Sequence, residues 1–307
     1  MNGARARSDV LARRSDARGA VHLGGHLGVL GVLAVVVWRA WGSLLAVPAI
    51  VAYGVVLMFL FCALHECVHR TAFRSRWMAD VVAAATGAVL LLPSRWFRSF
   101  HAAHHRFTQD PGRDPELVGA KPLTRSRIVL HASGAAYWAS ALVVLVRLAV
   151  GRSVGTYVPV GQARKVVSQA RLLVVLYAAI AGASAITRST AAIRLWLLPV
   201  VVGQPFLRAL LLAEHDGCPL VDDATSNTRT TITNPVVRFL AWNMPFHAEH
   251  HMHPAIPFHQ LPALHAAIGD RLQVVGDGYV RTYVARQRAR WRAAASDGAP
   301  QRGGSSR

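Results

Sequence analysis

Cysteine is scarce in this sequence of 307 residues, and its few copies are scattered. Cys62, Cys67 and Cys218 lie in or just after apolar segments and form neither a disulfide pattern nor a CxxC pair. The sequence therefore predicts no thiolate metal site and no iron–sulfur cluster. It also lacks a GxGxxG segment after a strand and an HPGG haem motif, so no flavin, nicotinamide or fused haem domain is expected.

Negative charge is scarce as well. Fifteen Asp and Glu face 34 Lys and Arg, which gives a formal net charge of +19, and the only lysines are Lys121 and Lys165. Such a charge is typical of nucleic-acid-binding proteins. Here, however, the arginines flank long apolar runs, no nucleic-acid motif appears, and 53% of the residues are hydrophobic. We therefore expect no nucleic-acid partner and predict a membrane protein with its arginines on one side of the bilayer.

Four apolar runs are expected to cross the membrane as two hairpins. They cover 23–37, 44–64, 172–186 and 195–213. Residues 1–20 form an Arg-rich tail that is expected to be disordered, and a signal peptide fits them poorly. The positive-inside rule places this tail in the cytoplasm, so each hairpin returns the chain to that side. The membrane domain is predicted over 21–275, with a basic tail over 276–307.

Histidine occurs in four clusters next to the apolar runs. Their nine members are His65, His69, His101, His104, His105, His215, His247, His250 and His251. Imidazole is the usual nitrogen ligand for iron, zinc and copper. The two HxxHH triplets share one helix face each, so the three rings of a triplet are expected to converge on one point. The remaining histidines are interpreted as bystanders, with His253 in reserve: His22, His26, His131, His253, His259 and His265.

One metal site built from all four clusters requires every cluster to lie on the same membrane side. The apolar pieces 78–93 and 128–150 then cannot each be a full crossing. We expect 78–93 to dip into the interface and 128–150 to lie along the surface, or to be buried in the bundle without crossing. The predicted fold is an all-α membrane protein with four transmembrane helices in two hairpins and a cytoplasmic, histidine-rich helical cap.

The order HxxxH, HxxHH, lone His, HxxHH between paired spans resembles the integral-membrane fatty acid desaturase and hydroxylase superfamily. The matching residues are HECVH (65–69), HAAHH (101–105), AEH (213–215) and HAEHH (247–251). The segment NTRTTITN (227–234), followed by WNMPFHAEHH, is similar to bacterial desaturase-like members. The resemblance covers about residues 25–270 and implies that the nine clustered histidines hold two irons.

The sequence departs from this family at one position. Some desaturases add an Asn ligand one helical turn before the lone histidine, and here that position is Leu211. Water, substrate, Glu214 or Asn243 could fill the tenth ligand position. Other polar residues are candidates for the surroundings of the irons. Glu66 and Glu249 could orient ligand histidines, and Asp110, Asp114 and Arg229 could contact the centre or a substrate headgroup.

The resemblance implies a non-haem di-iron oxidoreductase that uses O2 to desaturate a fatty acyl or lipid-like chain. The same site in a hydroxylase of a lipid or secondary metabolite is the alternative, and a zinc-based hydroxylase fits the residue types too. A histidine-rich metal transporter or sensor would carry its ligands inside the spans, whereas these clusters lie at or beyond the span ends.

The resemblance also implies partners and a location. Since no electron-carrying cofactor has a motif in this chain, a separate ferredoxin-like donor and its reductase are expected, and a basic face would attract an acidic carrier. We expect a multi-pass protein of a bacterial plasma membrane, embedded in its lipid bilayer, with its active site on the cytoplasmic side.

Overall fold

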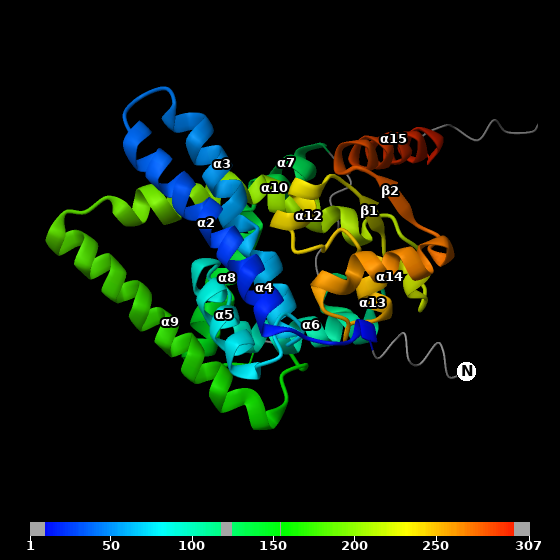
Figure 1. The fold of residues 1–307 in the computed structure, drawn as a ribbon, viewed down its shortest axis with the longest axis horizontal. Coiled ribbons are helices and arrows are strands. Elements are labelled where there is room, and N and C mark those ends of the chain that lie inside the picture. The colour runs from blue at the N-terminus through cyan, green and yellow to red at the C-terminus, as the bar shows by residue number, and fades with distance from the viewer. Residues whose placement is uncertain (1–9, 118–124, 154, 298–307) are drawn as a thin grey trace, which may run out of the picture.

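The computed structural model describes residues 10–117, 125–153 and 155–297. Long apolar helices stand beside a half of the molecule made of shorter segments (Figure 1). Four helices of the described ranges are long and apolar enough to cross a membrane: Asp16–Ala40, Ala46–Val68, Val160–Thr187 and Ile193–His215. They lie at the four places where the sequence predicts spans. Their elements are α2 (Asp16–Ala40), α3 (Ala46–Met58), α4 (Leu60–Val68), α9 (Val160–Thr187), η2 (Ile193–Leu197) and α10 (Leu198–His215).

Helix α2 begins earlier than the sequence predicts. Ser15 caps its first turn by accepting a hydrogen bond from the N–H of Arg18 at 3.2 Å, and Asp16 places a negative charge at the N-terminus. The Asp16 carboxylate also accepts hydrogen bonds from the N–H and hydroxyl of Ser75. The last residues of the expected disordered tail are therefore helical, and positions 1–9 lie outside the described residues.

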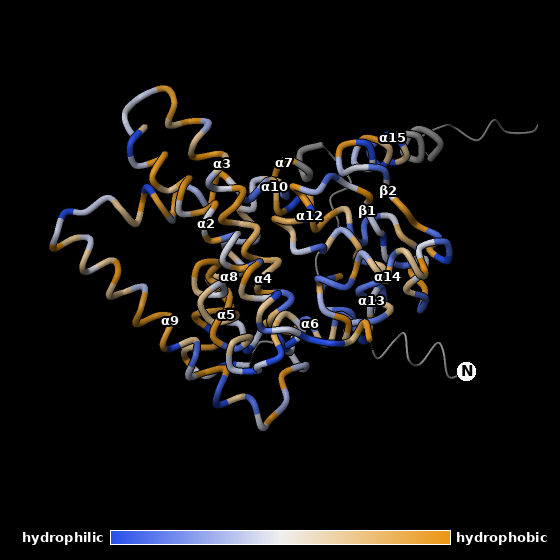
Figure 2. The backbone as a smooth tube through the Cα atoms, viewed as in Figure 1, coloured by the Kyte–Doolittle hydropathy of each residue, from blue (hydrophilic) through white to orange (hydrophobic). Residues whose placement is uncertain are grey.

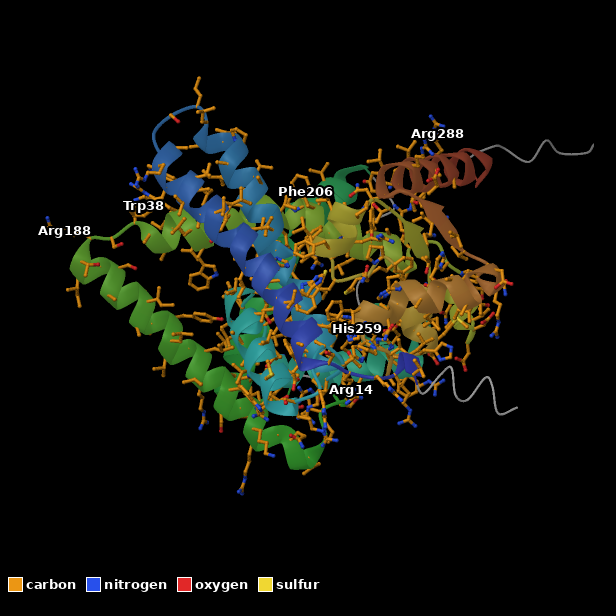
Figure 3. The ribbon with its side chains drawn as sticks, in the orientation of Figure 1. Arg14, Trp38, Arg188, Phe206, His259 and Arg288 are labelled. Atoms are coloured by element: carbon orange, nitrogen blue, oxygen red, sulfur yellow. The ribbon has the colours of Figure 1, made fainter. Side chains whose placement is uncertain are left out.

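Apolar side chains are exposed along the long helices. On α2, Val32 is 66% exposed, and on α9, Leu172 is 65% exposed. Figure 2 shows that hydrophobic residues predominate along α2, α3 and α9, while hydrophilic residues are frequent around α6 and α13. Arg188, at the turn after α9, lies at the far end of the molecule from His259 (Figure 3). Exposed apolar helices with a polar half at one end suit a bilayer-embedded protein.

A contact between two glycines sets the distance between α3 and α10. A Cβ on Gly54 would lie 2.5 Å from the carbonyl oxygen of Pro199, and one on Gly203 would lie 2.0 Å from the carbonyl oxygen of Gly54. Only glycine permits this close approach of two backbones. Helix α3 continues into α4 within the span Ala46–Val68, and α4 and α10 both run toward the polar half, so their C-terminal turns carry His65 and His215 there.

The apolar pieces 78–93 and 128–150 each contain a break. Helix α5 (Arg76–Val89) and α6 (Ser94–Phe107) meet at 100°. The second piece divides into α7 (Arg125–Ser133) and α8 (Ala135–Ala149) at Gly134, where φ is +69°. A single surface helix over 128–150 was expected, but the left-handed backbone of Gly134 ends the first helix. The interfacial placement of both pieces stays a prediction.

The polar half is built mostly from short elements around the histidine cluster at 247–251. They are η1 (Pro115–Leu117), α11 (Ala224–Asn227), β1 (Thr230–Ile232), α12 (Pro235–Leu240), α13 (His247–Met252), η3 (Phe258–Gln260), α14 (Leu261–Ile268), η4 (Gly269–Arg271), β2 (Val275–Asp277) and α15 (Tyr279–Asp297). Strands β1 and β2 pair in parallel, with Thr230 opposite Val275. The all-α expectation is therefore correct except for this one small sheet in the described residues.

Helix α15 occupies the segment that the sequence predicts as a basic tail. It packs on the end of α10, where Arg286 and Arg290 both reach the carboxylate of Asp216. Asp216 is 5% exposed, so these ion pairs are shielded from solvent. The first part of the expected tail thus fastens the C-terminal end of α10, which is the end that carries His215.

Candidate metal centre

The nine clustered histidines gather into two adjacent groups. Within each group, one ligand atom per side chain lies within 4.8 Å of every other. The five-histidine group contains His65, His69, His101, His105 and His250, and the four-histidine group contains His104, His215, His247 and His251. Each group draws on helices that are distant in the sequence, so neither can form before the polar half docks on the long helices.

Helices α4, α6 and α13 build the five-histidine group. His65 lies in the last turn of α4, and His69 caps that helix. On α6 the Nε2 atoms of His101 and His105 are 3.0 Å apart, and His250 of α13 places its Nε2 3.2 Å from that of His69. Burial, with His104 and Arg98 adding to it, lowers the pKa of His69 to about 3. These rings are neutral at pH 7, as metal binding requires.

Helices α6, α10 and α13 build the four-histidine group. His104 and His215 approach to 3.2 Å between their Nε2 atoms. The Nε2 of His247 lies 3.1 Å from that of His215 and 3.1 Å from that of His251. Burial, followed by the surrounding imidazoles, holds the pKa values of His247 and His251 well below the usual range. All four Nε2 atoms face one small volume.

Each HxxHH triplet divides between the two groups. His101 and His105 enter the five-histidine group, while His104 between them enters the other. In the second triplet, His247 and His251 belong to the four-histidine group and His250 belongs to the five-histidine group. The expectation that three rings converge on one point is therefore wrong. Residues advance by about 100° around a helix, so i and i+4 differ by about 40°, whereas i+3 lies about 60° to the other side.

The imidazole nitrogens of the two groups are better satisfied by bound metal ions than by hydrogen bonds to one another. Both ring nitrogens of His65 are buried with no hydrogen-bond partner among the described residues. Where Nε2 atoms face each other, a pair of neutral imidazoles can share one proton at most, so converging rings leave buried lone pairs unsatisfied. A cation in each group would satisfy them together. Imidazole sets of this kind suit iron, and they suit zinc as well.

Two of the expected carboxylates lie behind ligand histidines. Asp114 accepts a hydrogen bond from Nδ1 of His104 at 3.0 Å and is 3% exposed. Glu66 lies 3.4 Å from Nδ1 of His65, and the hydroxyl of Thr71 donates to its other oxygen at 3.1 Å. The hydrogen bond to Asp114 orients the His104 ring and raises its basicity, whereas Glu66 lies beside His65 without a hydrogen bond to it.

The other acidic candidates differ in what they contact. Glu249 hydrogen bonds to His265 and Thr230 and not to one of the nine histidines. Asp110 pairs with Arg113 at the surface. Glu214, which is 8% exposed, places Oε2 3.5 Å from Nε2 of His247, on the side where the four-histidine group converges.

Arg229 and Asn243 stabilise the backbone around the centre. The guanidinium of Arg229 donates to the carbonyl oxygens of Ala213 and Asp216, on either side of His215. Asn243 donates its side-chain N–H to the carbonyl oxygen of Phe258 at 3.0 Å. Both residues therefore shape the segments that carry the histidines, and these contacts do not involve the histidine rings.

Sequence reasoning missed several residues that contact the ligand histidines or Glu249. His265, interpreted as a bystander, pairs with Glu249. Thr108 lies 3.1 Å from Nδ1 of His251 through its hydroxyl, and Gln109 donates to the carbonyl oxygen of His215 at 2.8 Å. Thr108 and Gln109 directly follow α6, but nothing in their residue type indicates that they meet α13 and α10. His26 and His22 are bonded to backbone carbonyls of Val56 and Phe239, away from both groups.

The sequence of this chain is similar to those of known proteins. A family model described as "Fatty acid desaturase" matches residues 39–283, a range that contains all nine histidines. The chain is also similar to a protein named sn-1 oleoyl-lipid 12-desaturase from Picosynechococcus sp.. The two are 23% identical over 260 residues, which cover 78% of this chain and 73% of that protein.

Proposed function

The chain belongs to the fatty acid desaturase family, and on that premise we propose that it is an oxygen-dependent di-iron desaturase. Its substrate is a fatty acyl or lipid-like chain, into which it introduces a double bond. The observation that carries the proposal is the pair of buried histidine groups, which share α6 and α13 and lie at the ends of apolar helices. A lipid tail can reach this position from the bilayer while its head stays in water.

The reaction sets what the protein must provide. Two adjacent methylenes lose two hydrogens, and one O2 takes them up with two further electrons and two protons to leave as two waters. When bound, two irons supply the redox chemistry that couples these changes. The chain's own residues hold the irons, orient the His104 ring through Asp114, and keep the centre dry.

We infer that the two electrons come from a separate carrier. None of the cofactor motifs considered above occurs in the chain, and its formal net charge is +19. An acidic, ferredoxin-like protein would be attracted to its basic face. Binding of the purified protein to such a carrier should weaken steeply with salt. Binding that does not change between low and high ionic strength would argue against this electrostatic docking.

A cavity on α10 is the proposed position for part of the substrate. It measures about 260 Å³ and is lined mainly by apolar atoms, with Ala209 and Ala213 of α10 facing Tyr279 and Tyr283 of α15. Ala213 lines it, and the next residue, Glu214, contacts His247. Ala209→Trp should fill the cavity and reduce turnover while iron content is unchanged. Ala178→Trp, on the exposed face of α9, is the control. Full turnover in Ala209→Trp would place the substrate elsewhere.

Product analysis tests the reaction itself. Membranes containing the wild-type protein, a reductase and a ferredoxin are incubated with defined acyl lipids and compared with membranes containing His250→Ala by mass spectrometry. A product lighter by two hydrogens, made only by the wild type, is expected. A product heavier by one oxygen would assign a hydroxylase instead. Metal analysis of the purified protein should find two irons per chain, and zinc alone at full occupancy would overturn the di-iron proposal.

A further inference from the structure

The two histidine groups are unequal, and the difference points to a missing ligand. One group has five imidazoles and the other has four. One helical turn before His215, where some relatives are expected to carry an Asn ligand, this chain has Leu211, whose side chain packs against the hydrophobic core. The four-histidine group therefore needs a donor from another position if its metal is to match the coordination number of the first.

The side of the imidazole ring that a carboxylate contacts distinguishes a ligand from an orienting group. Asp114 contacts His104 at Nδ1, and Glu66 contacts His65 and His250 at Nδ1. Glu214 is different, because its Oε2 lies 3.5 Å from Nε2 of His247. The Nε2 atoms of His104, His215, His247 and His251 are the ones that converge. Glu214 is thus on the Nε2 side of His247, where the four nitrogens converge, and its oxygens lie outside the set of atoms that are all within 4.8 Å of one another.

The Glu214 carboxylate has one cationic neighbour among the described residues, Arg208, and no hydrogen bond to it is seen. Its Oε1 is buried and has no hydrogen-bond partner among the described residues. Burying an anion without compensation is expensive, and a bound cation would compensate it. The alternative donor, Asn243, already donates its side-chain N–H to the carbonyl oxygen of Phe258.

The backbone around Glu214 is fixed from both sides. Its carbonyl oxygen accepts the N–H of Arg229 at 2.7 Å. The Arg229 guanidinium donates to the carbonyl oxygens of Ala213 and Asp216, and the Asp216 carboxylate is paired with α15. Because the last turn of α10 is held this tightly, the backbone position of Glu214 is fixed in advance of metal binding.

We propose that Glu214 is the fifth protein ligand of the metal in the four-histidine group, so that one iron has five neutral nitrogens and the other has four nitrogens and an anionic oxygen. This inference rests on the proposed di-iron function and adds to it. The carboxylate lowers the net charge of one site by one unit relative to the other. Carboxylate is also the harder ligand, so the two irons become chemically distinct.

Iron content and Mössbauer spectroscopy of the full-length protein, loaded with ⁵⁷Fe in detergent, test the proposal. The wild type should hold two irons per chain and show two quadrupole doublets of equal area. Glu214→Ala should weaken one iron by more than the roughly 10- to 100-fold typical of losing an orienting partner, so that iron content falls toward one per chain and one doublet disappears. Asp222→Ala removes an exposed carboxylate and should leave both doublets unchanged.

Two further variants keep the test decisive. Glu214→Gln preserves shape, so it addresses the case in which Glu214→Ala does not fold, and it should shift one doublet only. Combining Leu211→Asn with Glu214→Ala places an amide one turn before His215 and should restore the second iron. Two irons with unchanged doublets in both Glu214 variants would overturn the ligand assignment and leave the di-iron function standing. A wild type without two irons would overturn the function itself.

Discussion

His104 donates its Nδ1–H to the carboxylate of Asp114 across 3.0 Å, and its Nε2 faces the other rings of the four-histidine group. The hydrogen bond fixes the tautomer, because Nδ1 must carry the proton and Nε2 must carry the lone pair. The partner is well placed for this, since Asp114 is itself held by the N–H groups of Gln109 and Glu116. One buried carboxylate thus joins the loop after α6 to the metal centre.

Asp114→Asn should lower the affinity of one iron by about 10- to 100-fold without unfolding the protein. The amide retains the shape of the side chain but no longer stabilises the required tautomer. Iron loss to a chelator, followed over time in purified protein, measures the effect. Asp110→Asn is the matched control, since Asp110 pairs with Arg113 at the surface. Equal rates of iron loss in the two variants would contradict an orienting role for Asp114.

The contact between Gly54 and Gly203 predicts a stability effect remote from the irons. Gly203→Ala places a methyl group 2.0 Å from the carbonyl oxygen of Gly54, so the helices must separate, at a cost of about 1–3 kcal/mol. Gly28→Ala has open space on α2 and should be neutral or stabilising by up to ~1 kcal/mol. Denaturant unfolding in mixed micelles measures both. A Gly203→Ala protein as stable as the wild type would mean that the helices do not touch there.

How much the sequence could predict depends on the range of the interaction. Hydropathy predicts the positions of the four long helices, because apolar runs of about that length usually form membrane-spanning helices. The histidine spacing predicted a shared site, since i and i+4 rings on one helix are neighbours wherever that helix docks. His69 and His65 are such a pair, and both lie in the five-histidine group.

The division of the triplets could not be obtained in the same way. Whether His104 joins His101 or His215 depends on how α6 sits against α10, which no local pattern of residues reveals. The same holds for Glu214 and Glu249, since both stand next to a histidine in the sequence. Glu214 faces Nε2 of His247, whereas Glu249 turns toward His265. Their roles follow from the packing of α10, α13 and α14, not from their neighbours in the chain.

Acid should loosen the contact between the N-terminal end of α2 and the polar half through His259. Burial, with Arg18 and His22 adding to it, lowers the pKa of His259 to about 4, and Nδ1 of His259 lies 3.4 Å from the Arg18 guanidinium. Because the folded pKa lies below the unfolded value of about 6.5, stability is complete above that pH and falls as pH drops toward 4.

His259→Asn should reduce this acid sensitivity. Unfolding temperatures at pH 7 and pH 5 give the comparison, and the drop between them should be smaller in the variant than in the wild type. His259 lies outside both histidine groups, so iron content at pH 7 serves as the control and should not change. An equal drop in both proteins would assign the acid sensitivity to other groups.

The adjacent residues His104 and His105 should affect different irons. His104 belongs to the four-histidine group with His215, while His105 belongs to the five-histidine group, with its Nε2 3.0 Å from that of His101. His104→Ala and His105→Ala therefore each remove one ligand from a different metal. In ⁵⁷Fe-loaded protein, each variant should lose or shift one Mössbauer doublet, and the doublet affected should differ between them. His253→Ala, outside both groups, should keep both doublets. If the two variants changed the same doublet, the division of the triplets would be wrong, and the three rings of each triplet would have to share one iron.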